Sequence, residues 1–205
     1  MATLSDPPLR GSARITGVFF DPARGIAAVA SEFPLLAVPR ARAAYGGQAL
    51  RYRVALYRRG ESSPFAALDA LRHPVNDVAF HPTESVAAIG AGSYDGGYLF
   101  EGELVAWDWG NGRHTRLFER MPEVARCACD ADGRGITAWV RPWDEEWEGL
   151  PDTPDAAFNT LYRVRVPYGE ATWSKAPAQS PALCADDAAP EEAPRAQAAA
   201  SGDRL

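Results

Sequence analysis

The stretch Asp77–Gly90, "DVAFHPTESVAAIG", decides the fold because it places two short apolar runs on either side of a turn. In the first run apolar residues alternate with others, which is the period of a β-strand. The second run is rich in Ala and β-branched residues. Both runs are too short for helices, and the Pro-containing turn suits a tight hairpin. The stretch therefore predicts two antiparallel strands.

The same pattern occurs twice more in the chain. Gly17–Ala30, "GVFFDPARGIAAVA", has Val, Phe, Pro and an Ala-Ala pair at the same spacing. Arg126–Trp139, "RCACDADGRGITAW", has small apolar residues at the Val and Phe positions, and it matches with one extra residue before Ile136. Self-similarity at a regular spacing indicates a repeat architecture, so the chain is expected to contain three copies of one unit.

Each hairpin is followed by a third alternating run that ends in a Gly-containing turn: Tyr52–Ser62, Gly102–Gly112 and Thr160–Glu170. A short fourth run comes after each of these, "PFAALD", "HTRLF" and "EATWS". The unit is then a four-stranded antiparallel meander with a period of roughly 50 to 60 residues. We expect an all-β protein with blades at about 14–70, 71–119 and 120–175, a flexible N-terminus at 1–13 and a disordered tail at 176–205.

The middle unit resembles the WD-repeat β-propeller family over residues 73–112. It has a His before the first strand, Val-x-Phe-x-Pro in that strand, Ser and Asp-Gly after the second strand, and Trp-Asp at the end of the third. The resemblance implies a hydrogen-bonded structural network within the blade, formed by His73, Asp95, Trp107 and Asp108. The first and third units lack the His and the Trp-Asp pair, and Tyr57 and Arg58 stand at the Trp-Asp position in the first.

Three blades are too few for a closed ring, since closed propellers have about four to eight. The last thirty residues are Ala/Pro-rich and acidic, with too few large apolar groups to form another blade. An open arc would expose an apolar blade face that is too large for a stable monomer. We therefore expect the propeller to be completed by a second copy, by another polypeptide or by missing chain.

The connections between second and third strands are long in all three units, at 31–51, 94–102 and 141–159. In a radial stack these loops emerge on one face, and elaborated loops often carry binding surfaces. The hypothesis is a partner-binding face with aromatic anchors and acidic residues: Tyr94, Asp95, Tyr98, Phe100, Trp143, Asp144, Glu145 and Trp147. The alternative is that the aromatic side chains fold back over the edges of their own blades.

The composition and the remaining motifs argue against several classes of function. The net charge of −6 argues against nucleic-acid binding. The N-terminal residues have no signal-peptide pattern and no run is long enough to span a membrane, so we expect a cytoplasmic protein. Cys127 and Cys129 are expected to be buried structural thiols, and we expect no metal site, no cofactor and no catalytic residue.

These patterns favour a non-catalytic protein–protein interaction module. The WD-repeat resemblance implies a scaffold within a larger complex, and for bacterial relatives a signalling or defence complex. The alternative is a propeller-type enzyme, or a protein that binds a small ligand or carbohydrate, with its site on the same loop face.

Overall fold

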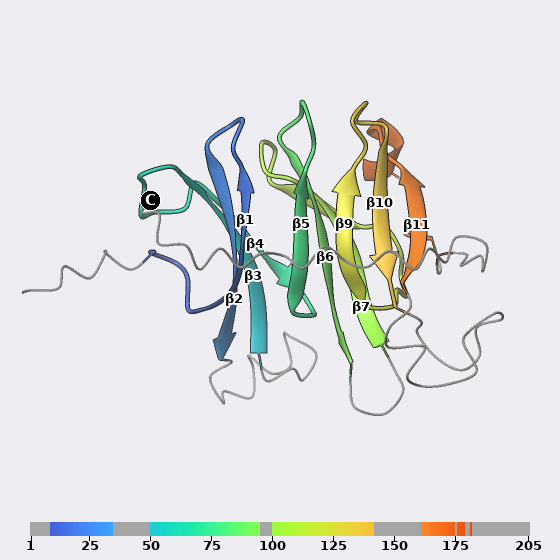
Figure 1. Cartoon of the computed structure of the whole chain (residues 1–205), viewed down its shortest axis with the longest axis horizontal. Helices are drawn as coiled ribbons and strands as arrows, with labels where there is room; N and C mark the ends of the chain where they lie inside the picture. Colours follow the sequence, from blue (N-terminus) through green and yellow to red (C-terminus); the bar gives the residue numbers. More distant parts are fainter. Residues whose placement is uncertain are drawn as a thin grey trace, which may run out of the picture.

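The structure is a computed structural model that describes residues 9–34, 50–94, 100–141, 161–174, 176–178 and 181. Within these residues eleven strands form three antiparallel sheets that stand side by side along the chain (Figure 1). The prediction of an all-β fold built from repeated meanders is confirmed. Of the predicted flexible N-terminus at 1–13 the structure describes 9–13, and of the predicted disordered tail at 176–205 it describes 176–178 and 181; the rest of both lies outside the described residues.

The first two sheets have four strands each, in the order of the sequence. The first sheet consists of β1 (Arg14–Asp21), β2 (Ile26–Pro34), β3 (Leu50–Arg58) and β4 (Ala66–Leu71). The second consists of β5 (Val75–Phe80), β6 (Val86–Tyr94), β7 (Phe100–Asp108) and β8 (Arg113–Arg116). The third contains β9 (Val124–Cys129), β10 (Gly135–Val140) and β11 (Tyr162–Pro167).

The prediction of a fourth strand in the third unit is wrong for the run "EATWS". Glu170–Trp173 forms a short 3₁₀ helix, η1, because the N–H of Gly169 donates to the Thr172 hydroxyl while the Thr172 N–H donates back to the Gly169 carbonyl. The indole of Trp173 then packs edge-on against Tyr168, with ring centroids 6.2 Å apart. The third sheet therefore has three strands among the described residues.

The predicted extra residue before Ile136 is also absent. Ile136 lies opposite Cys129 in the β9–β10 pair, just as Ala27 lies opposite Phe20 in the β1–β2 pair. The two hairpins therefore match residue for residue, and Ile136 corresponds to Ala27 rather than to Ile26. Side-chain similarity misled the alignment, because the ladder position is set by the turn and not by residue type.

The three sheets are arranged as the blades of an open β-propeller. Their first strands are neighbours, since β5 contacts both β1 and β9 (Figure 1). Each sheet has a front face, directed toward the position of a preceding blade, and a back face, directed toward the next one. The front face of the second sheet packs on the back face of the first, and the front face of the third packs on the back face of the second.

Two apolar cores lie between these blades. The core between the first and second sheets includes Leu56, Leu68, Val78, Ile89 and Trp107. The core between the second and third includes Leu104, Met121, Ile136, Val140 and Tyr162. Small residues on the second strands, Ala28 and Ala88 among them, are fully buried and let the sheets approach closely.

Side chains of β5 replace the missing backbone ladder between the second and third blades. The carboxylate of Asp77 accepts hydrogen bonds from the N–H groups of Cys127, at 2.8 Å, and Val78, at 2.9 Å. The amide of Asn76 donates to the Val124 carbonyl at 3.0 Å and to the Gly92 carbonyl at 3.1 Å. Burial raises the pKa of Asp77 despite these hydrogen bonds. The two first strands are thus held in a fixed register.

The close approach of the second and third blades can be tested at Gly90. A Cβ atom there would lie 2.5 Å from Cγ1 of Val124, so we expect Gly90→Ala to lower the free energy of unfolding by about 1–3 kcal/mol through overpacking. The matched control is Gly169→Ala, since a Cβ at Gly169 meets nothing within 4 Å. Urea unfolding of both variants measures the difference, and an equal effect would contradict the close packing.

Candidate functional site

The three long connections all leave from one end of the blades. Strands β2, β6 and β10 end there and β3, β7 and β11 begin there, at the lower end in Figure 1. The connecting residues 35–49, 95–99 and 142–160 lie outside the described part of the chain. The same holds for most of the predicted partner-binding residues, namely Asp95, Tyr98, Trp143, Asp144, Glu145 and Trp147. Their role stays a prediction.

The two remaining members of that set lie at the strand ends. Tyr94 is the last residue of β6 and pairs with Phe100, the first residue of β7. The side chain of Phe100 is only 4% exposed. Phe100 is therefore buried, and its role as a partner-binding residue stays a prediction, as does the alternative in which these aromatic residues cover their own blades.

The predicted blade network is only partly described, because Asp95 lies outside the described residues. Trp107 is buried between the first and second blades, with its ring edge-on to Trp109 at a centroid distance of 6.4 Å. Asp108 accepts hydrogen bonds from the Asn111 N–H, at 3.1 Å, and from the Arg113 Nε, at 2.9 Å. Burial opposes ionisation of Asp108, but these hydrogen bonds outweigh it and lower its pKa. This carboxylate secures the β7–β8 turn.

His73 lies near the other end of β7 and contacts a residue that the sequence analysis missed. Glu103 is 3% exposed, and its Oε1 accepts hydrogen bonds from the N–H groups of Arg72, at 2.5 Å, and His73, at 3.3 Å. Its Oε2 lies 2.7 Å from Nε of Arg116, whose Nη2 donates to the Ala70 carbonyl. Desolvation lowers the pKa of His73. The buried ion pair thus fastens the connection between the first two blades to β7 and β8.

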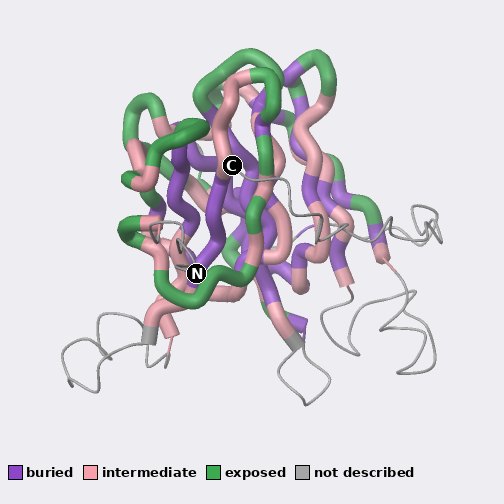
Figure 2. Tube along the Cα trace, turned by 60° about the vertical axis from the view of Figure 1, so that its left-hand side comes forward, coloured by how far each residue is buried: buried purple, intermediate pink, exposed green. Residues whose placement is uncertain are grey.

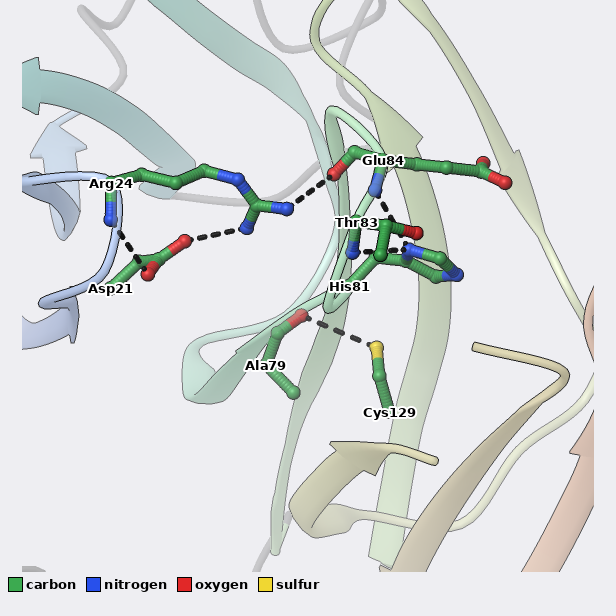
Figure 3. Close-up of polar contacts among 7 residues, drawn as sticks. All are labelled: Asp21, Arg24, Ala79, His81, Thr83, Glu84 and Cys129. Carbon is green, nitrogen blue, oxygen red and sulfur yellow. Dashed lines mark hydrogen bonds and ion pairs between the residues drawn. The ribbon is translucent and has the colours of Figure 1, made fainter. Parts of the chain in front are cut away.

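The opposite end of the blades carries the first hairpin turns. Asp21, His81 and Asp130 follow equivalent strand positions in β1, β5 and β9. Nδ1 of His81 accepts from the Glu84 N–H at 2.9 Å and the Thr83 N–H at 3.3 Å (Figure 3). Its Nε2 lies 2.9 Å from the Gly133 carbonyl, so these partners assign the proton to Nε2. His81 is buried, and its contact with Gly133 bridges the second and third blades.

Further contacts extend this series of turns across the molecule. The Arg24 guanidinium donates to the carboxylate of Asp21 at 2.6 Å and to the Glu84 carbonyl at 3.3 Å (Figure 3). The Tyr168 hydroxyl donates to the Glu84 carboxylate at 2.8 Å. The Glu84 turn is therefore tied to the first blade on one side and to the third on the other. These contacts hold the turns in place, so we assign a structural role to the polar residues at this end of the blades.

The front face of the first sheet is the surface most suited to a partner. Ile15, Val18 and Phe20 are 46%, 42% and 58% exposed, and they are the large apolar side chains that stand out on the described surface. A cavity of about 620 Å³ lies beside them, lined by Leu9, Tyr57 and Arg58 among others. Figure 2 turns this sheet toward the viewer and contrasts its exposed segments with the buried strands behind it.

The described part of the N-terminal segment, from Leu9 onward, covers only part of this face. Leu9 packs against Val29 and Tyr57, and the Tyr57 hydroxyl donates to the Arg10 carbonyl at 2.7 Å. Together with a hydrogen bond from the Arg10 N–H to the Ser62 carbonyl, these contacts hold the segment against β3. The apolar residues of β1 are left open. A surface of this kind on a soluble protein commonly marks an interface.

The described residues contain no group of three or more His, Cys, Asp or Glu side chains that could hold a metal ion. No helix in the described part is long and apolar enough to cross a membrane. Cys127 is buried and Cys129 half-buried, and both thiols face the core between the second and third blades.

Comparisons with known proteins add little to this picture. No protein-family model matches the chain. A search of curated proteins also finds no match. Among solved structures the chain is similar to the one described as "Crystal structure of RRP9 WD40 repeats", with 17% sequence identity and a TM-score of 0.31. The alignment covers 46% of this chain and 34% of that one, so the chain spans about a third of the length of that structure.

The buried ion pair of Glu103 provides the first test of the site. Glu103→Ala removes the carboxylate that pairs with Arg116 and accepts from two backbone N–H groups, so we expect a loss of about 3–5 kcal/mol in the free energy of unfolding. Glu101→Ala, at an exposed position of the same strand, should change it by less than about 0.5 kcal/mol. Thermal and urea unfolding measure both, and similar losses would refute the assigned role of Glu103.

The thiols provide a second test. Burial raises the pKa of Cys129 to about 11 and that of Cys127 well above its usual value. Since the thiolate is the reactive form, we expect both to resist iodoacetamide at pH 8 in the folded protein and to react fully in denaturant. Peptide mass mapping reports each cysteine separately. Rapid labelling of Cys127 in the folded protein would show that the core between the second and third blades is open.

Proposed function

We propose that the protein is a non-catalytic interaction module that binds a partner protein through the open front face of its first sheet. The observation that carries the proposal is the exposure of Val18 and Phe20 in a folded blade. Their counterparts in the second sheet, Val78 and Phe80, pack against a neighbouring blade. Apolar and aromatic side chains at the centre of a surface patch are the usual anchors of protein interfaces.

A second surface, at the end that carries the long loops, belongs to the same proposal. The predicted aromatic and acidic residues of these loops would add specificity to a bound partner. Support for this part comes from the placement of the described strand ends, which start all three connections from one end of the blades. Membership of a larger bacterial signalling or defence complex rests on the WD-repeat resemblance of residues 73–112 alone. The alternative of an enzyme or a ligand-binding protein has no specific observation in its favour among the described residues.

The proposal predicts that Phe20→Asp abolishes partner binding without unfolding the protein. Phe20 is 58% exposed, so its replacement should cost less than about 1 kcal/mol of stability. A buried charge at the centre of an interface should weaken binding by tenfold or more, about 1.4 kcal/mol. The measurement is the amount of a stoichiometric protein retained by the tagged full-length chain from the lysate of its own cells.

The control is Ala131→Asp, which adds the same charge at an exposed turn of the third blade. It should retain the partner at the level of the unchanged protein. Equal retention by Phe20→Asp would contradict the proposed surface. The absence of any stoichiometric protein in all three samples would contradict the proposed function itself.

A further inference from the structure

The pairing of the strands shows which residues of the second sheet occupy the same positions as residues of the first. On the front face, one ladder row consists of Val18, Val29 and Ala55 in the first sheet. The corresponding row of the second sheet consists of Val78, Ile89 and Val105. A second row contains Phe20, Ala27 and Tyr57 in the first sheet, and Phe80, Ala87 and Trp107 in the second. The two front faces therefore have nearly the same shape and apolar character.

In the second sheet, this front face is buried against the back face of the first. Val78 is 6% exposed there, whereas Val18 at the equivalent position is 42% exposed. The first sheet thus carries a complete blade-docking face that no blade among the described residues occupies. Because the equivalence holds row by row, the contact between the first two blades is a template for what would fit.

The template defines the chemistry of the occupant. The back face that receives Val78 and Ile89 is formed by rows of Gly17, Ala30 and Val54 and of Phe19, Ala28 and Leu56. The back face of the second sheet has Asp77, Gly90 and Leu104 in the first row and only alanines in the second. Small residues on the second strand permit the close approach, since even a Cβ at Gly90 would clash with Val124. The occupant is therefore a sheet with small residues on its second strand and small or aliphatic residues on its third.

The back face of the third sheet does not fit this description. Its first row is Arg126, Trp139 and Arg163, and its second is Ala128, Thr137 and Arg165. The indole of Trp139 stands at the position of Ala30 in the first sheet and Gly90 in the second, where a side chain larger than a methyl group has no counterpart. Arg165 is exposed and pairs with Asp130 at 2.5 Å. A polar outer face of this kind is what terminal repeats use to end a stack in solvent.

Charge also argues against a second copy of the chain as the occupant of this face. Arginines edge the front face of the first sheet, at positions 51, 53, 58 and 59. Docking the arginine-bearing back face of a second copy would bring like charges together, which costs affinity. The template is a contact between a front face and a back face, and a front-to-front pair of two copies does not reproduce it.

From these observations we propose that the front face of the first sheet docks the back face of a β-sheet blade in a partner protein. That blade has small and aliphatic residues at its centre, and it extends the arc at the Arg14–Asp21 end. The inference rests on the proposed function, since it names the kind of partner that the interaction module binds.

The docking competence of this face can be tested with the chain itself. The substitutions Arg126→Asp, Trp139→Gly, Thr137→Ala, Arg163→Leu and Arg165→Ala give the third sheet the back-face rows of the second. Each copy of this variant then carries both halves of the contact. We expect it to assemble head to tail, as closed dimers or longer chains, with a mass at least about twofold that of the unchanged protein. Size exclusion with light scattering gives the mass.

Two controls make the result decisive. Adding Phe20→Asp to these five substitutions should restore the mass of the unchanged protein. Glycine in a strand lowers stability, so a second variant with Trp139→Ala in place of Trp139→Gly, and with Arg126→Asp, Arg163→Leu and Arg165→Ala, is also measured. Circular dichroism and cooperative unfolding establish that each variant is folded. A folded variant with unchanged mass overturns the proposal, and so does an unchanged protein that already dimerises through Phe20.

The outcomes also separate this inference from the proposed function. If a stoichiometric partner is lost with Phe20→Asp but the folded variants stay at unchanged mass, the face binds a protein that is not a blade. If the variants assemble but the chain retains no partner from the lysate, the face can dock a blade and the proposed function is contradicted.

Discussion

The close approach of successive sheets is the constraint on which the rest of the structure depends. Two sheets can bury their faces fully only where the second strand of one blade has almost no side chain, as at Ala28, Ala88 and Gly90. Large residues such as Leu56 and Ile89 then fill the space around these positions. The alanine-rich second strand is therefore a packing requirement, and its recurrence in the sequence reflects the spacing between blades.

Polar groups fix the register that apolar packing alone leaves open. Asp77 and Asn76 join the first strands of the second and third blades, while Glu103 joins the connection after the first blade to β7 and β8. His81 connects the turns at the other end. Glu103 and His81 are buried and Asn76 and Asp77 are half-buried, all with hydrogen bonds made. Removing a partner would leave the remaining group to bear the cost of its desolvation. A slip of one blade against the next would break several of them at once.

The alternation and the Ala-Ala pairs were sufficient to predict the strands and their grouping, because both arise from local geometry and from the contact between blades. The fourth strand of the third unit could not be predicted correctly, since "EATWS" has strand-like residues but the Gly169–Thr172 hydrogen bonds favour a turn. His81 and Glu103 were missed because their partners are distant in sequence, as with Gly133 and Arg72. The sequence did contain a signal for each residue. Glu103 is a charged residue inside the apolar run "GELVAWDW". His81 stands where the other two repeats have an aspartate, Asp21 and Asp130.

The two ends of the arc differ in a way that bears on its stability. The third blade ends in arginines and a half-buried Trp139, which solvent accommodates, whereas the first ends in open Val18 and Phe20. Covering these side chains would stabilise the folded state in proportion to the apolar area buried. A ligand that binds only the folded chain adds stability that grows with its free concentration. The first blade therefore gains most from a bound partner, and the third, already capped by polar groups, gains little.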